Sequence, residues 1–388
     1  MLPFLSISQG KHVTGSHYTK LRNLGIIVII LSLFYFSLSA FDSHVRPGTV
    51  DYLSSFIPQR YNEPQVRPGI VEMTFYSTTD NKRYLSSDLA VHTGLGNHIF
   101  ELMSVYGMSR TLDRIPAFFI ETERYQKMLN YTREIVPGLI DQFTVFPGKI
   151  PEGTKNTTLE NRKCCVFHDP MKFANNTDTH LHFMNHFYQS WKYFPNRRDE
   201  IRSYLKPQKE FRILPESNQT NQITCIHVRR GDFLRMKFYM SEASFIQKAV
   251  EYIQNQESNH KQVNQITVMF GDDPQFMKDI FPGAVFSNVT ESEVNNTTVH
   301  FISSNSPSDD LLYSSQHCDT LLISAPISTF GWWLGYLSKG NQVFYHDVRA
   351  VNEGLYKVGH LSPVEFYPPK WTALKFSSDN STVIKSDL

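Results

Sequence analysis

The alternation of short apolar runs with helical patterns between residues 223 and 345 restricts the fold more than any other feature of the sequence. Strands that alternate with helices predict an α/β fold whose parallel sheet is covered on both faces. Ligands of such sheets bind beyond the carboxyl ends of the strands, so motifs at those ends are expected to share one site. The expected strands are Ile223–Val228, Gln265–Phe270, Thr320–Ile323 and Val343–Tyr345, and the expected helices are Tyr239–Asn255 and Thr329–Leu337.

The first half of the chain shows a weaker form of the same alternation. The apolar residues of Asn97–Asp113 recur at roughly helical spacing, and Ile115–Ile120 indicates a strand. Residues 121–200 are harder to divide, and their aromatic-rich run His182–Phe194 is expected in the core or at an interdomain hinge.

An apolar run of 18 residues without a charge, Leu24–Phe41, precedes this globular part. As a helix it would extend about 27 Å, close to the thickness of the hydrocarbon core of a bilayer. Basic residues before the run and acidic residues after it place the N-terminus in the cytosol. An uncleaved signal anchor is favoured over a cleaved signal peptide because the run exceeds the roughly 7–15 residues of the apolar h-region of a signal peptide. The expected segments are a cytosolic tail (1–23), the anchor (24–41), a stem (42–83), an N-terminal domain (84–215), a C-terminal domain (216–375) and a tail (376–388).

Eight Asn-x-Ser/Thr sequons, all beyond the apolar run, support a lumenal location for the rest of the chain. In an oxidising compartment the four cysteines, Cys164, Cys165, Cys225 and Cys318, can form disulfides, and their three pairings stay open. The sequons of Asn295 and Asn296 overlap, so at most one of these two residues is expected to carry a glycan. The predicted glycosylation sites are Asn130, Asn156, Asn175, Asn218, Asn288, Asn295, Asn296 and Asn380.

The charge balance excludes a general affinity for nucleic acid. The chain has 38 Lys and Arg residues against 37 Asp and Glu residues, so any anion site must be local. No Cys/His spacing indicates a zinc site, and no convincing Ser/His/Asp or Cys/His nucleophile set is present.

The first motif that could carry chemistry is HVRRGD, at residues 227–232. Its arginines follow a strand, where a guanidinium can donate two parallel hydrogen bonds to a phosphate. The alternative is a structural ion pair with Asp232 or with an acid of a neighbouring strand. A cell-adhesion use of the Arg-Gly-Asp tripeptide fits poorly, because it needs an exposed hairpin tip. We expect Arg229 to contact a ligand and consider Arg230 as suited to holding the loop.

A second motif, GDDP, follows the next strand at residues 271–274. Asp272 or Asp273 could accept hydrogen bonds from a ligand, or the pair could hold a metal, although the spacing differs from the Asp-x-Asp pattern. As an alternative, one of the two aspartates caps the following helix, with Pro274 in its first turn.

Two further motifs open helices. In ISTFGWWLGYL, the hydroxyls of Ser328 and Thr329 and the free N–H groups of the helix start can face an anion, and Gly331 permits close approach. Its tryptophans are expected to pack the helix onto the sheet. GLGNHIF, at residues 94–100, lacks the third glycine of a dinucleotide fingerprint, but it could present Asn97 and helix N–H groups to the same ligand.

Together with QSWKYF and FYPPKW, these four motifs resemble the α1,2-fucosyltransferase family, glycosyltransferase family eleven, from about residue 84 to residue 375. The resemblance implies two Rossmann-like domains facing across a cleft (GT-B type) and an inverting transfer of fucose from GDP-fucose to a sugar hydroxyl, without a metal or other cofactor. It places Arg229 at the diphosphate, with His227 and Asp232 in the same motif. Asp272 or Asp273 falls near the guanosine, and Ser328 and Thr329 fall near the phosphates.

The chain departs from the family pattern after Asn97. It has His98 where the family commonly has Gln, and residues 101–104, Glu-Leu-Met-Ser, replace the usual run of small residues. These departures leave the acceptor undetermined.

A Golgi enzyme anchored by one helix is therefore expected, with its catalytic part in the lumen and a glycan, most simply a galactoside, as acceptor. The oligomeric state stays open, a homodimer included. Two alternatives remain: an enzyme related to the protein O-fucosyltransferases, and a membrane-anchored glycan-binding protein that has lost catalysis.

Overall fold

The computed structural model describes residues 82–387, apart from 160–162, 185–186, 258–262 and 291–297. The expected anchor, nearly all of the stem and the sequons at Asn295 and Asn296 lie outside the described residues. Among the residues that are described, no helix combines the length and the apolar character needed to cross a membrane.

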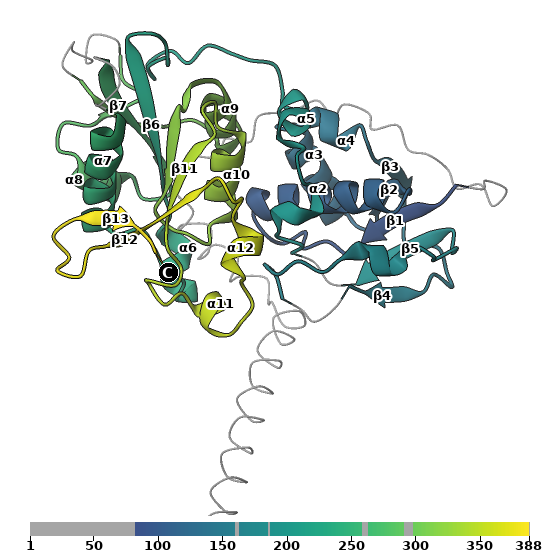
Figure 1. Ribbon diagram of the computed structural model, residues 1–388. Coiled ribbons are helices and arrows are strands. Elements are labelled where there is room, and N and C mark those ends of the chain that lie inside the picture. Colours follow the sequence, from purple (N-terminus) through teal and green to yellow (C-terminus); the bar gives the residue numbers. More distant parts are fainter. Residues whose placement is uncertain (1–81, 160–162, 185–186, 258–262, 291–297, 388) are drawn as a thin grey trace, which may run out of the picture. The chain divides into compact units, whose positions relative to one another are not determined.

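The first half of the described chain forms a five-stranded sheet in the order β3-β2-β1-β5-β4 (Figure 1). All of its pairs are parallel. The expected helix after the glycine turn is confirmed as α2, which begins two residues early, at Leu95, and the expected strand Ile115–Ile120 is confirmed as β2. The elements are β1 (Tyr84–Ser87), α2 (Leu95–Thr111), β2 (Ile115–Ile120), α3 (Glu123–Arg133), α4 (Pro137–Ile140), β3 (Thr144–Pro147), β4 (Asn156–Thr158) and β5 (His180–Met184).

The second half forms an eight-stranded sheet in the order β13-β12-β11-β10-β6-β7-β9-β8. Its neighbours are parallel except for β12 and β13. The strands are β6 (Asn221–Val228), β7 (Asn264–Gly271), β8 (Val285–Phe286), β9 (His300–Ile302), β10 (Thr320–Ile323), β11 (Gln342–His346), β12 (Thr372–Phe376) and β13 (Val383–Lys385). The helices are α6 (Gly231–Met236), α7 (Ala243–Glu257), α8 (Pro274–Ile280), α9 (Pro307–His317), α10 (Thr329–Leu337), α11 (Gly354–Lys357) and α12 (Pro363–Phe366).

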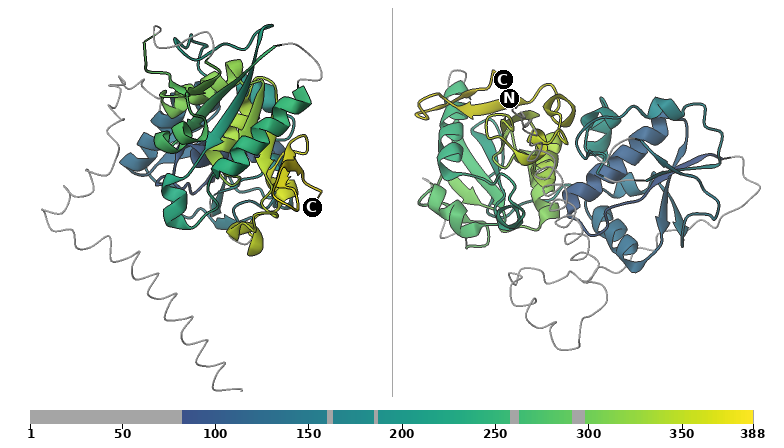
Figure 2. Two further views of the ribbon diagram at one scale, coloured as in Figure 1. Left: turned by 90° about the vertical axis from the view of Figure 1, so that its left-hand side faces the viewer. Right: turned by 90° about the horizontal axis from the view of Figure 1, so that it is seen from below.

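Helices cover both faces of the eight-stranded sheet, as the alternation of strands and helices predicts. Helices α7 and α8 lie on one face and α9 and α10 on the other (Figure 1), and Figure 2 shows the same layers from two further directions. The alternating side chains of β6 explain this arrangement. Cys225 belongs to the apolar cluster that contains α10, whereas Ile226 belongs to the cluster that contains α7.

One expectation about chain organisation needs correction. Residues 376–388, expected as a tail, contain β13, which pairs antiparallel with β12 and extends the sheet. The aromatic run His182–Phe194 is split between β5 and a short 3₁₀ helix at Trp191–Tyr193, and its expected place in the core is confirmed, because Phe183 and Phe194 are fully buried there. Between that turn and β6, the short helix α5 (Arg198–Ser203) belongs to the segment that joins the two sheets.

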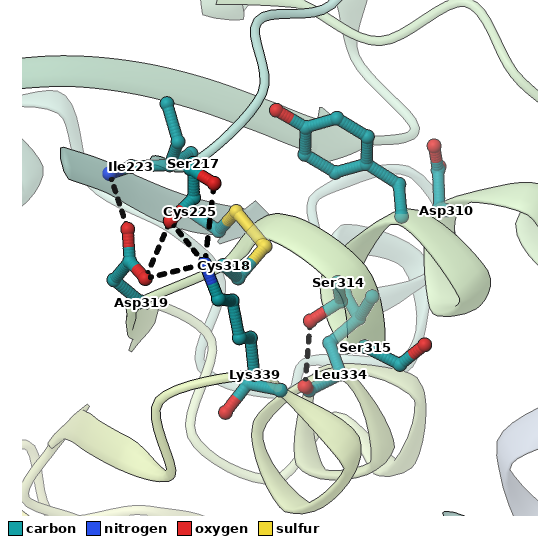
Figure 3. Close-up of a disulfide and its surroundings, with 12 residues drawn as sticks. Ser217, Ile223, Cys225, Asp310, Ser314, Ser315, Cys318, Asp319, Leu334 and Lys339 are labelled. Atoms are coloured by element: carbon teal, nitrogen blue, oxygen red, sulfur yellow. Dashed lines mark hydrogen bonds and ion pairs between the residues drawn. A yellow bond between two sulfur atoms is a disulfide. The ribbon is translucent and has the colours of Figure 1, made fainter. Parts of the chain in front are cut away.

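The structure selects one of the three cysteine pairings that the sequence left open. Cys225 of β6 is bonded to Cys318, the residue that follows α9, across 93 positions of the chain (Figure 3). The adjacent Cys164 and Cys165 form the second disulfide. Beside the buried Cys225–Cys318 bond, the Asp319 carboxylate accepts hydrogen bonds from the Ser217 hydroxyl and the Ile223 amide. The disulfide and this carboxylate therefore join β6 to the residues that directly precede β10.

Candidate functional site

The carboxyl end of β6 carries His227, which lies at the centre of the eight-stranded sheet. The ring is buried, and its Nε2 atom lies 3.3 Å from the Ser328 hydroxyl. Burial, and then the charge of Arg229, lower the pKa of His227 to about 3. The imidazole is therefore neutral at physiological pH, so it positions its neighbours through packing and hydrogen bonding rather than through charge.

The start of α10 packs directly on this histidine. A Cβ atom at Gly331 would lie 2.6 Å from His227 Nδ1, so the glycine is required for this contact. Ser328 caps the helix by accepting a hydrogen bond from the Gly331 amide, and it is buried. The next residue, Thr329, is half-buried at the first turn of the helix. The expected proximity of Ser328, Gly331 and His227 is observed.

Arg229 is bound by two carboxylates. Its Nε atom lies 2.8 Å from Asp232 Oδ1 and 3.3 Å from Asp272 Oδ2, and its Nη2 atom donates to Asp232 Oδ2 at 2.8 Å. The structural ion pair considered from the sequence is thus present. Nη1 has no hydrogen-bond partner within the described part of the chain. Because the side chain remains 34% exposed, one edge of the guanidinium stays open to a ligand.

Arg230 holds the loop. Its backbone N–H donates to Asp272 Oδ1 at 2.9 Å, its Nη1 atom donates to the Ser241 carbonyl, and its Nε atom pairs with Asp273 at 3.2 Å. Its guanidinium also lies over the Phe276 ring, 4.0 Å from the centroid. Asp273 caps α8 by accepting a hydrogen bond from the Phe276 amide, so the capping alternative holds for this aspartate.

Two serines that sequence reasoning missed connect the strand ends. The Ser241 hydroxyl accepts a hydrogen bond from the Arg229 amide and lies 2.6 Å from the Ser324 hydroxyl, which donates to the His227 carbonyl. Both serines are fully buried. They fix the backbone of the arginine motif against the end of β10. No local sequence signal could have found them, because they lie 83 residues apart.

Helix α2 approaches the start of α10 through Gly96. A Cβ atom at Gly96 would lie 2.5 Å from the Phe330 amide nitrogen, and the Trp333 indole donates to the Gly96 carbonyl at 3.0 Å. The N-termini of the two helices therefore meet, as the glycine turn suggested. Asn97 lies at this junction, and its side-chain oxygen accepts a hydrogen bond from Gln189. The two helix N-termini bring first-turn N–H groups and positive partial charge to this junction, which favours an anion.

The residues that depart from the family pattern are buried beside this junction. Glu101 is fully buried, and its carboxylate accepts hydrogen bonds from the amides of Ala90 and Phe187. Burial lowers the pKa of His98 to about 4, so this ring is also neutral. Glu101 thus joins the loop before α2 to the segment that follows β5.

A further acid, Asp310 of α9, lies buried after β9. The Ser303 hydroxyl donates to its carboxyl group, and burial raises the pKa of Asp310 to about 8. Sequence reasoning missed this residue because a carboxylate in the first turn of a helix usually indicates a favourable interaction with the dipole rather than a buried acid.

The remaining site predictions can also be placed. Trp332, Trp333 and Tyr336 are buried and pack on one another, as expected for core residues. Across the described residues, no group of three or more His, Cys, Asp or Glu side chains could hold a metal ion. Of the sequons, Asn130 lies in α3 and is half-buried, whereas the others in the described residues are exposed: Asn156, Asn175, Asn218, Asn288 and Asn380.

Comparison with known proteins places this site in a family. Residues 72–373 match the model of glycosyl transferase family 11. The chain belongs to this family. The resemblance inferred from the motifs is thereby confirmed, and so is the expectation of a glycosyltransferase.

Several proteins of Caenorhabditis elegans are similar to this family 11 chain. A putative glycosyltransferase is 44% identical, over 78% of this chain and 83% of that protein. A putative galactoside 2-alpha-L-fucosyltransferase is 43% identical, over the same shares of the two chains. A galactoside 2-alpha-L-fucosyltransferase is 33% identical, over 73% of this chain and 74% of the relative.

The crystal structure of NodZ alpha-1,6-fucosyltransferase soaked with GDP-fucose is a distant match to the fold. It shares 11% identity, covers 79% of this chain and 99% of NodZ, and gives a TM-score of 0.39. At that TM-score the likeness is too remote to bear on the site.

Proposed function

We propose that this family 11 protein transfers L-fucose from GDP-fucose to the 2-hydroxyl of a galactoside, with its two sheets in a GT-B arrangement. The observation that carries the proposal is the meeting of the α2 and α10 N-termini beside the strand end that bears His227 and Arg229. Such a junction suits the diphosphate of a nucleotide sugar. The names of the relatives at 43% and 33% identity support fucose and the galactoside 2-hydroxyl.

The reaction requires stabilisation of a leaving group. The acceptor oxygen bonds to the anomeric carbon of fucose with inversion, the bond from that carbon to the β-phosphate oxygen breaks, and GDP leaves with the electron pair. Negative charge therefore grows on the β-phosphate. The first-turn N–H groups of α10, the Thr329 hydroxyl and the open edge of Arg229 are donors that would bind this charge more tightly in the transition state than in the ground state.

We propose that these donors make a metal unnecessary. The proton of the acceptor hydroxyl passes to a base or to solvent, and an oxocarbenium-like path lowers the demand for a strong base. Asp272 anchors Arg229 and the Arg230 amide in this scheme, so it shapes the donor site indirectly. His227 and Asp232 hold the α10 start and the Arg229 plane respectively.

We further propose a location in the Golgi membrane, with a single anchor at Leu24–Phe41 and a lumenal catalytic part. Support comes from the uncharged apolar run, the sequons and the two disulfides, because disulfides persist in oxidising compartments. The glycan acceptor would then be carried by a glycoprotein or a glycolipid of the secretory pathway.

A single assay tests the chemistry. The full chain in detergent is supplied with GDP-fucose in EDTA, together with a β-galactoside glycan, its 2-deoxy analogue or a folded protein acceptor. We expect GDP release and transfer to the β-galactoside only. Equal transfer to the 2-deoxy analogue would refute the 2-hydroxyl, and activity only with added Mn²⁺ would refute the metal-free step. Transfer to the protein acceptor alone would favour an enzyme related to the protein O-fucosyltransferases. Glycan binding without GDP release would favour a glycan-binding protein that has lost catalysis.

A further inference from the structure

The linker helix α5 donates hydrogen bonds to the far end of α10. Arg198 Nε donates to the Tyr336 carbonyl at 2.9 Å, and Arg198 Nη2 donates to the Ser338 carbonyl. Arg202 Nη1 donates to the Leu337 carbonyl, and its Nη2 atom donates to the Ser315 carbonyl at the end of α9 at 2.9 Å. Two guanidiniums from the segment between the sheets thus occupy the carboxyl end of the helix whose other end forms the candidate site.

These contacts meet two physical needs of a helix terminus. The last four carbonyl groups of an α-helix have no partner inside the helix, and together they carry a negative partial charge. Arginines from a neighbouring element satisfy the carbonyls and neutralise the charge. Both side chains are largely buried, since the Arg198 side chain is 21% exposed and Arg202 is of intermediate exposure. Screening by solvent is therefore weaker than at the surface.

The same short helix also contacts α2. Glu200 Oε1 accepts hydrogen bonds from the Tyr106 hydroxyl of α2 at 2.5 Å and from the Tyr204 hydroxyl at 2.9 Å. The two helices that meet at Gly96 and Thr329 are thus joined a second time, through α5, near their other ends. A cross-link at both ends fixes the axial position of one helix relative to the other.

We propose that Arg198 and Arg202 are positioning residues for the donor diphosphate, acting through α10; this inference rests on the proposed function. Helix α10 has nine residues and a length of about 13 Å, and its buried tryptophans prevent bending. A displacement at the carboxyl end is therefore transmitted to Ser328 and Thr329.

The test compares the binding of GDP and GMP to the full chain, because only GDP carries the β-phosphate. The variant is Arg198→Met combined with Arg202→Met. The matched control is Arg197→Met. This neighbouring arginine pairs with Glu200 and lies over the Tyr106 ring of α2, but among the described residues no hydrogen bond or ion pair joins it to α10. Arg198→Lys and Arg202→Lys keep the charge but lose the fork geometry.

We expect the double methionine variant to bind GDP about threefold to tenfold more weakly, with GMP affected less than twofold. The lysine variants should lie between it and the wild type, and Arg197→Met should match the wild type. An equal loss for both nucleotides would show a purely structural role and overturn the inference, as would unchanged GDP binding. If the double variant does not fold, the lysine variants decide by the same criterion. A wild-type chain that binds neither nucleotide would instead refute the proposed function.

Discussion

Gly96 offers the sharpest test of the junction between α2 and α10. A Cβ atom at this position would lie 2.5 Å from the Phe330 amide nitrogen and 2.6 Å from the Thr329 carbonyl carbon, both of which are backbone atoms. Ordinary carbon contacts need about 3.5 Å, so Gly96→Ala must separate the two helix starts by about 1 Å. Overpacking of this kind costs about 1–3 kcal/mol of stability. A displacement of that size at a binding site costs on the order of tenfold to a hundredfold in turnover.

The same motif supplies a matched control. Gly94 has extended backbone angles, with φ −84° and ψ 166°, and nothing lies within 4 Å of a Cβ atom there. Gly94→Ala should therefore be neutral or slightly stabilising. The free energy of unfolding of the two variants would be compared by denaturant titration, followed by tryptophan fluorescence. Their rates of fucosyl transfer and their affinities for GDP would be compared in parallel. If Gly96→Ala were as stable and as active as Gly94→Ala, the close approach of the two helices would be wrong.

Three further results are expected. Arg229→Ala should lower kcat on the order of 10²–10³-fold, and near-normal turnover would remove this arginine from the donor site. Cys318→Ser should lower the free energy of unfolding by about 4 kcal/mol, because the disulfide closes a long loop; an unchanged denaturation midpoint would contradict this. Burial lowers the pKa of His346 from 6.5 to about 3. Between these two pH values the unfolded chain binds more protons than the folded chain, so the free energy of unfolding should decrease as the pH is lowered from 6.5 towards 3. His346→Phe should keep the stacking on Phe245 and flatten this acid dependence, and thermal unfolding at pH 7 and pH 4.5 would measure it.

The sequence predicted those elements whose apolar runs are long enough to show a helical or strand period. The strand Thr320–Ile323 and the helix Thr329–Leu337 have the bounds that their patterns indicated. Elements with two or three residues, such as β8 (Val285–Phe286) and β13 (Val383–Lys385), were missed because a period of two cannot be detected over so short a length. Their pairing depends on the neighbouring strand rather than on their own composition.

The candidate site was predictable in its location but not in its contacts. A strand end places a residue at one edge of the sheet, so the convergence of HVRRGD, GDDP and ISTFG followed from the fold class alone. Which carboxylate binds which guanidinium depends on side-chain rotamers and on loop paths. Long-range contacts such as Ser241 with Ser324, and Arg202 with Leu337, have no local signature.

The ion pairs of the structure change the net charge that the arginine motif presents to a ligand. From the sequence, Arg229 and Arg230 could bind a phosphate or form structural ion pairs. In the structure, three aspartates, Asp232, Asp272 and Asp273, contact these two arginines, so the charges +2 and −3 leave the cluster at −1. A cluster with that balance does not attract a diphosphate by net charge. Its use is geometric, because the carboxylates fix the plane of the guanidinium and leave one edge open. The attraction for the anion must then come chiefly from the starts of α2 and α10, whose N–H groups have no acidic partner in the first turn.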